Sequence, residues 1–161
     1  MESSQKKQAM IVSLRVLAAS AKSTQELEKK LERSGFDPGI IRETIETLQR
    51  QGILDDRLYA ENLTARLVTA KGSGRRRVSF ELARKGVRPE LRRQILEKLT
   101  PEAEQERARE IGLGRWERLS NLPLDKRRKR VYDFLLRRGY DDSVVRVILE
   151  DLRRRTDTER A

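Results

Sequence analysis

The stretch that decides the fold is KGSGRRRVSFELARKGVRPELRRQILEKL, residues 71–99. Two segments with apolar residues at helical spacing flank a central glycine, Gly86. Glycine readily takes the left-handed conformation that ends a helix, so this pattern predicts a helix hairpin that turns at Gly86. The stretch also holds nine basic side chains between Lys71 and Arg93, against only two acidic ones, Glu81 and Glu90.

The hairpin pattern recurs on both sides of this stretch. Three segments align without gaps: EKKLERSGFDPGIIRETIETL (28–48), SFELARKGVRPELRRQILEKL (79–99) and YDFLLRRGYDDSVVRVILEDL (132–152). The aligned glycines lie 51 and 53 residues apart, and a leucine precedes each glycine by four positions. We expect these six residues to hold the hairpins together: Gly35, Gly86, Gly139, Leu31, Leu82 and Leu135.

One further helix before each hairpin gives a repeat of three helices and ~50 residues. The predicted fold is therefore all-α, with tandem three-helix repeats at 6–54, 55–99 and 100–155 and a polar tail at 156–161. Apolar residues make up 36% of the chain and charged residues 39%. This composition favours a thin, elongated array of stacked repeats over one thick core.

Local signals place the ends and faces of several helices. The capping residues that we expect are Ser23 with Glu26 as a capping box, Asp37, Asp55 or Asp56, and Asp141. The apolar face expected for the first helix consists of Met10, Ile11, Leu14, Leu17 and Ala18. The helix that starts at Pro101 has weak apolar spacing, and we expect Gly112 and Gly114 to interrupt it.

Charge is concentrated in one part of the chain. Residues 71–138 hold 21 basic and 10 acidic groups, a net charge of +11, whereas residues 1–70 and 139–161 carry net charges of +1 and −1. Such a distribution predicts a directed contact with a polyanion. The alternative for each basic group is a solvated face offset by neighbouring glutamates.

Thirteen cations are candidates for this contact. Arg75, Arg76 and Arg77 are expected at a helix start, where unpaired N–H groups attract anions. Arg137 and Arg138 repeat the placement of Arg84 and Lys85 just before a hairpin glycine. The full predicted set is Lys71, Arg75, Arg76, Arg77, Arg84, Lys85, Arg88, Arg92, Arg127, Arg128, Arg130, Arg137 and Arg138.

Aromatic side chains are few, and we expect most of them in the core rather than stacked on nucleic-acid bases. Those at hairpin or helix-stripe positions are Phe36, Phe80, Tyr132, Phe134 and Tyr140. Trp116 lies in a polar, basic setting, where packing is favoured over partner contact.

Several chemistries are excluded by what the chain lacks. It has no cysteine and no histidine, so disulfides, thiolate or imidazole catalysis and most zinc sites are absent. The pairs Asp55-Asp56 and Asp141-Asp142 stand where helix caps are expected, and Gly72-Ser73-Gly74 lacks the spacing of a phosphate-binding loop. We therefore expect no catalytic residue, cofactor or metal. No apolar run reaches the ~18 residues of a membrane span.

The sequence resembles the RecX family of bacterial RecA modulators over about residues 8–152. The resemblance rests on GILDDRLYAENL (52–63), GSGRRRVSFELARKGV (72–87) and LLRRGYDDSVVRVIL (135–149), in this order. It implies three tandem three-helix repeats in an elongated, curved array. It also implies binding in the groove of the RecA–DNA filament, with inhibition of filament extension, ATP hydrolysis and strand exchange in DNA recombination and repair.

We expect a cytoplasmic protein, with a monomer as the default. The resemblance implies the RecA filament as its partner, and we also expect weak, nonspecific binding to single- or double-stranded DNA. Two other functions stay open. One is a stand-alone DNA-binding protein that contacts mainly phosphates, since three-helix units can resemble helix-turn-helix modules. The other is a scaffold whose basic groove binds an acidic protein unrelated to recombination.

Overall fold

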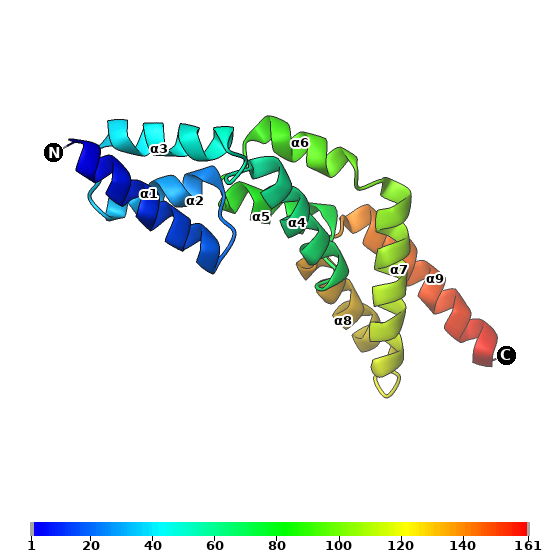
Figure 1. Cartoon of the computed structure of the whole chain (residues 1–161). Helices are drawn as coiled ribbons and strands as arrows, with labels where there is room; N and C mark the ends of the chain where they lie inside the picture. Colours follow the sequence, from blue (N-terminus) through cyan, green and yellow to red (C-terminus); the bar gives the residue numbers. More distant parts are fainter. Residues whose placement is uncertain (1, 161) are drawn as a thin grey trace. The chain divides into compact units, whose positions relative to one another are not determined.

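The computed structural model describes residues 2–160, which contain nine α-helices and no strand (Figure 1). The helices are α1 (Glu2–Ala19), α2 (Thr24–Arg33), α3 (Pro38–Arg50), α4 (Asp56–Thr69), α5 (Arg75–Arg84), α6 (Pro89–Glu97), α7 (Pro101–Arg118), α8 (Leu124–Arg137) and α9 (Asp142–Arg160). This confirms the all-α prediction. Within these residues, no helix is both long enough and apolar enough to cross a membrane.

The helices form two compact units. The first unit comprises residues up to Leu63 together with Leu82–Arg92, and the second comprises Thr64–Glu81 together with the residues from Arg93 onward. Parts of α4, α5 and α6 therefore belong to each unit. The boundaries predicted for the middle repeat, 55–99, are not those of a compact unit and stay a prediction from the sequence.

The core of the first unit lies between α1, α2 and α3, which pack against one another (Figure 1). Its buried residues are Leu27, Leu31, Ile41, Ile45, Leu48 and Leu54. The face predicted for α1 is partly wrong, because Ile11 and Leu14 are 45% and 41% exposed. Ala9 and Ser13 are buried instead, and the Ser13 hydroxyl donates a hydrogen bond to the Ala9 carbonyl at 2.8 Å.

The core of the second unit lies between α7, α8 and α9 (Figure 1). Its buried residues are Ala108, Trp116, Val131, Leu135, Tyr140, Val145, Ile148, Leu149 and Leu152.

The expected interruption of α7 is wrong, since the helix continues through Gly112 and Gly114. Gly112 is buried, and a Cβ there would lie 3.2 Å from Ile148, so the missing side chain lets α7 and α9 pack closely. Helix α9 continues to Arg160, through most of the predicted polar tail.

The three hairpin turns are built alike, as the repeat predicted. Gly35, Gly86 and Gly139 have φ angles of 82°, 78° and 88°, in the left-handed region. The residue after each glycine donates its N–H to the carbonyl of the leucine four positions before the glycine, at 3.3, 3.0 and 3.3 Å. These leucines, Leu31, Leu82 and Leu135, are fully buried. The bonds are those of the Schellman motif, which satisfies the last carbonyls of a helix.

The predicted helix starts are also confirmed where the structure describes a cap. Ser23 and Glu26 form the capping box of α2, and Asp37 accepts the Gly39 N–H at the start of α3. At the start of α4 the Asp55 carboxylate accepts the Leu58 N–H at 3.0 Å, which identifies Asp55 and not Asp56 as the cap.

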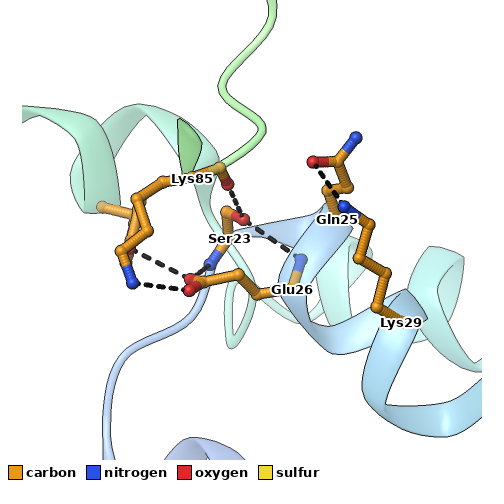
Figure 2. Close-up of polar contacts among 6 residues, drawn as sticks. Ser23, Gln25, Glu26, Lys29 and Lys85 are labelled. Carbon is orange, nitrogen blue, oxygen red and sulfur yellow. Dashed lines mark hydrogen bonds and ion pairs between the residues drawn. The ribbon is translucent and has the colours of Figure 1, made fainter. Parts of the chain in front are cut away.

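Asp56 takes part in a junction between successive repeats inside the first unit. Its Oδ1 accepts the N–H of Thr24, the first residue of α2, at 2.7 Å. The hydroxyl of Ser23 donates to the carbonyl of Lys85, which precedes the hairpin glycine Gly86 (Figure 2). We call these contacts the first junction.

The second unit contains an equivalent junction, in which α5 takes the place of α2. Each residue at the start of α2 corresponds to the residue 51 positions later in the sequence. Glu104 of α7 accepts the N–H of Arg75, the first residue of α5, at 2.7 Å. The Gly74 N–H donates at 2.7 Å to the carbonyl of Arg138, which precedes Gly139. We call these contacts the second junction, and they show that the repeats share a mode of packing as well as a turn.

Candidate functional site

The second junction brings together cations from two distant parts of the sequence. Because the start of α5 lies against the turn between α8 and α9, the Arg76 N–H donates to the Gly139 carbonyl at 3.1 Å. A hollow of ≈ 460 Å³ lies at this place. Its basic lining residues are Lys71, Arg77, Arg137 and Arg138, four of the thirteen predicted cations.

The first junction has the opposite electrostatic character. Lys85 Nζ lies 2.7 Å from Glu26 Oε1 there, and both side chains are largely buried (Figure 2). At the equivalent positions of the second junction, Arg77 corresponds to Glu26 and Arg138 corresponds to Lys85, so both residues are arginines. The first junction thus neutralises its cation internally, whereas the second places two like charges at the matching positions.

The local charges set the ionisation of Glu26. Burial raises the pKa of this carboxyl, but hydrogen bonds from Lys85, from the Ser23 N–H and from Tyr59 outweigh it and hold the pKa below its ordinary value. Lys85 is therefore engaged inside the first unit by a carboxylate that stays ionised at neutral pH. This position makes it a poor candidate for partner contact.

The arginines at the start of α5 do not offer the anion site that the sequence suggested. The Arg75 N–H is taken by Glu104, a buried carboxylate, and the Gly74 and Arg76 N–H groups are taken by carbonyls. An internal anion thus already occupies the helix start. Any contact with an external polyanion must come from the side chains and not from the helix N–H groups.

Two of these side chains are paired but accessible. Arg76 Nε lies 3.6 Å from Asp141, and Arg77 Nη2 lies 2.9 Å from Glu81, with half or more of each arginine side chain exposed. The Arg76–Asp141 pair is exposed on both sides and therefore weak, so a phosphate or carboxylate of a partner can compete for Arg76. Glu81 is buried, so Arg77 is held more firmly, although half of its side chain is exposed. Arg77 also stacks over Phe80 at 5.9 Å from the ring centroid. Phe80 is 59% exposed, so its expected place in the core is wrong.

The basic run Lys126–Arg130 is divided by its position on α8. Arg127 is buried, its Nε donates to the Trp116 carbonyl at 2.7 Å, and its guanidinium stacks over the Trp116 ring at 4.2 Å. The structure therefore places Arg127 in the interior, although we expected it to face a partner. Trp116 is packed in the core as expected, and Arg128 and Arg130 are exposed.

Three further candidates, Arg84, Arg88 and Arg92, belong to the first unit, as does Lys85. Arg84 and Arg88 are exposed, whereas the Nε of Arg92 is buried without a hydrogen-bond partner. The other nine members of the predicted set belong to the second unit.

A second basic feature was missed by sequence reasoning. A cleft of ≈ 670 Å³ in the second unit is lined by cations of α7 together with Lys71 and Arg138. The α7 cations are Arg107, Arg115 and Arg118. Their spacing of eight and three residues places them on one face of a helix, which is the signal that could have identified them.

Comparison with known proteins supports the assignment of the repeats. Models for the first, second and third three-helix domains of RecX match residues 9–48, 55–96 and 102–149. The regulatory protein RecX of Amycolatopsis mediterranei is 32% identical over 148 residues, which cover 91% of this chain and 85% of the relative. That of Trichlorobacter lovleyi is 32% identical over 150 residues, which cover 92% of this chain and 97% of the relative.

Solved structures show the same fold. The crystal structure of RecX from Lactobacillus salivarius superposes with a TM-score of 0.83 at 19% identity, covering 93% of this chain and 97% of that one. A second crystal structure of regulatory protein RecX gives a TM-score of 0.79 at 23% identity, covering 91% of this chain and 73% of that one.

Proposed function

This chain belongs to the RecX family of regulatory proteins, and from this premise we propose that it binds the RecA filament on DNA and lowers its activity. The observation that carries the proposal is the match of all three RecX domains, in order, along the chain. The activities expected to fall are filament extension, ATP hydrolysis and strand exchange. The chain acts by binding, since a ligand shifts an equilibrium by its differential affinity for the two states.

The contact surface that we propose is the group of cations at the second junction. Lys71, Arg76, Arg77, Arg137 and Arg138 lie together there, and four of them line one hollow. Arg76 and Arg77 pair with Asp141 and Glu81, but the five cations outnumber these two carboxylates, whereas the first junction pairs Lys85 with Glu26. Arginine suits such a surface because its guanidinium binds phosphate and carboxylate groups through two parallel hydrogen bonds.

The test is a titration of RecA ATP hydrolysis on single-stranded DNA. We expect the wild-type chain to suppress hydrolysis, and a variant with Arg76, Arg77 and Arg137 changed to Gln to need a higher concentration. Glutamine is preferred to glutamate because a carboxylate at position 76 or 77 would face Asp141 or Glu81. Undiminished hydrolysis at an excess of wild-type protein defeats the proposal.

A matched control removes the same charge elsewhere. Arg33, Arg42 and Arg50 are exposed residues at the end of α2 and on α3, outside the basic part of the chain. Their replacement by Gln should leave the inhibition unchanged. Equal weakening in both triple variants would assign the effect to net charge and not to the second junction.

A stand-alone DNA-binding function is the second candidate, favoured by the hollow lined by four cations. It requires tight binding to duplex DNA in the absence of RecA. Weak binding that disappears at physiological salt is compatible with filament regulation and does not support this alternative.

A further inference from the structure

The cleft of ≈ 670 Å³ is distinct in composition from the hollow at the second junction, although Lys71 and Arg138 line both. Lys71, Arg107, Arg115, Arg118 and Arg138 line it, with Glu110 as the one acidic lining residue. Five cations around one carboxylate leave an excess of positive charge inside a concave space. Its volume is in the range of pockets that hold a small molecule or a segment of a larger ligand.

Two of these arginines have polar atoms that nothing in the described chain satisfies. Nε and Nη2 of Arg107 and Nε of Arg115 are buried without a hydrogen-bond partner. A buried donor that lacks an acceptor costs stability, and ordered water or a ligand commonly supplies the acceptor. The excess of positive charge in the cleft favours an anion with several oxygens as that ligand.

The positions of the arginine heads are fixed by an aromatic ring. Arg115 and Arg138 stack over Phe134, with their guanidinium carbons 5.4 and 5.0 Å from its centroid. Arg138 is held further by a hydrogen bond that it donates to the Lys71 carbonyl. The cations are thus arranged before any ligand arrives, which reduces the entropy lost on binding.

We propose that this cleft binds a free compound with two or more directly linked phosphate groups, such as a nucleotide polyphosphate. The guanidinium groups that line the cleft can bind phosphate in a bidentate manner. The inference goes beyond the proposed function, because the ligand is neither RecA nor DNA.

Substitutions at Gly114 can test binding to the cleft without destabilising the protein. It lines the cleft on α7, and a Cβ built there meets no atom within 4 Å. Alanine and glutamate both favour a helix over glycine, so Gly114→Ala and Gly114→Glu should each raise the melting temperature or leave it unchanged. Only glutamate adds a negative charge to the cleft.

Binding is measured with three probes, each without RecA: inorganic pyrophosphate, a nucleoside triphosphate and a short oligothymidylate. We expect Gly114→Ala to bind like the wild type and Gly114→Glu to bind roughly tenfold more weakly or worse. Binding of pyrophosphate and the triphosphate identifies a free phosphate compound as the ligand. Binding of the oligonucleotide alone assigns the cleft to nucleic acid and overturns the inference.

Arg115→Met is a second variant with a readout that a purely structural residue would not give. It removes the guanidinium with its unsatisfied Nε and keeps a shorter, unbranched apolar side chain, so the melting temperature should change little, whereas phosphate binding should weaken strongly. Arg42→Met, at an exposed position of α3 that does not line the cleft, is the matched control and should bind normally.

Two results overturn the inference. One is wild-type protein that binds neither pyrophosphate nor the triphosphate, whether or not it binds the oligonucleotide, and the other is binding that Gly114→Glu and Arg115→Met leave unchanged. Because none of these binding measurements contains RecA, such failures are separate from a failure to inhibit the filament.

Discussion

Single residues at matching positions give the two junctions different properties. Glu26 and Lys85 form an ion pair in the first junction, whereas Arg77 and Arg138 stand at the equivalent positions of the second. The backbone contacts are otherwise alike, with a helix-start N–H donated to a carboxylate at 2.7 Å in both. The first junction therefore pairs its cation across the contact, whereas in the second Arg77 pairs with Glu81 of its own helix and no carboxylate stands at the position that matches Glu26.

The Glu26–Lys85 pair should make the first unit sensitive to acid. The folded-state pKa of Glu26 is lowered, so its contribution to stability is present above the ordinary carboxyl pKa and disappears as pH falls through the folded value. Glu26→Gln should lower the free energy of unfolding by roughly 1–2 kcal/mol at pH 7. Urea denaturation between about pH 3 and pH 7 should show the two proteins converging below the ordinary carboxyl pKa of about 4.3. A difference that does not depend on pH would contradict this account.

The hairpin glycines should differ in their tolerance of a side chain. Gly35 and Gly139 both have a positive φ, so alanine costs ~1–2 kcal/mol at either position. A Cβ at Gly35 meets no atom within 4 Å, but a Cβ at Gly139 would overlap the backbone nitrogen of Arg77. We expect Gly139→Ala to cost a further ~1–3 kcal/mol in urea denaturation. Equal losses of stability in the two variants would show that the second junction is not packed as described.

At the scale of elements, the start of α5 depends on a carboxylate from another helix. Glu104, in the first turn of α7, is buried and accepts the Arg75 N–H. Glu104→Ala leaves this donor without a partner and should cost ~1–3 kcal/mol of unfolding free energy. Glu104→Gln keeps an acceptor oxygen and should cost less. Chemical denaturation of both variants checks the order, and a larger destabilisation with glutamine would argue against the hydrogen bond.

Elements with a local signal were predictable from the sequence. The glycine that ends a helix and the capping pair Ser23 and Glu26 lie within a few residues of the groups they satisfy. The face of α1 was not predictable, because apolar residues occur on more than one side of that helix. Packing against α2 and α3 selects the side of Ala9 and Ser13 over that of Ile11 and Leu14.

The candidate site was predictable only as a set of charges. Net charge located the basic part of the chain but could not separate Arg127, which packs on Trp116, from its exposed neighbours. It also gave no reason to select Arg107 or Arg115 from a helix rich in arginine and glutamate. The partners of these side chains come from segments far along the chain, so no local pattern reports which charges are buried, paired or accessible.

At the scale of the whole molecule, the uneven charge has a consequence for binding. Residues 71–138 carry the entire net charge of +11, since the charges of the flanking segments cancel. Attraction between such a segment and DNA weakens with salt, because binding releases counterions from the phosphates. The slope of log affinity against log salt is proportional to the number of phosphates that the protein neutralises. This slope can therefore distinguish binding to DNA from binding to RecA.

The salt dependence of binding can therefore assign Arg76, Arg77 and Arg137 to contacts with DNA or with RecA. If Arg76, Arg77 and Arg137 bind phosphates, their replacement by Gln should reduce the slope of log affinity against log salt by about 2–3, at about 0.7–0.9 for each phosphate that is no longer neutralised. If they bind carboxylates of RecA, affinity should fall with a much smaller change in slope, because few condensed counterions are released. The measurement is the affinity of both proteins for RecA filaments on single-stranded DNA between about 50 mM and 200 mM salt. An unchanged affinity at every salt concentration would remove these three arginines from the interface.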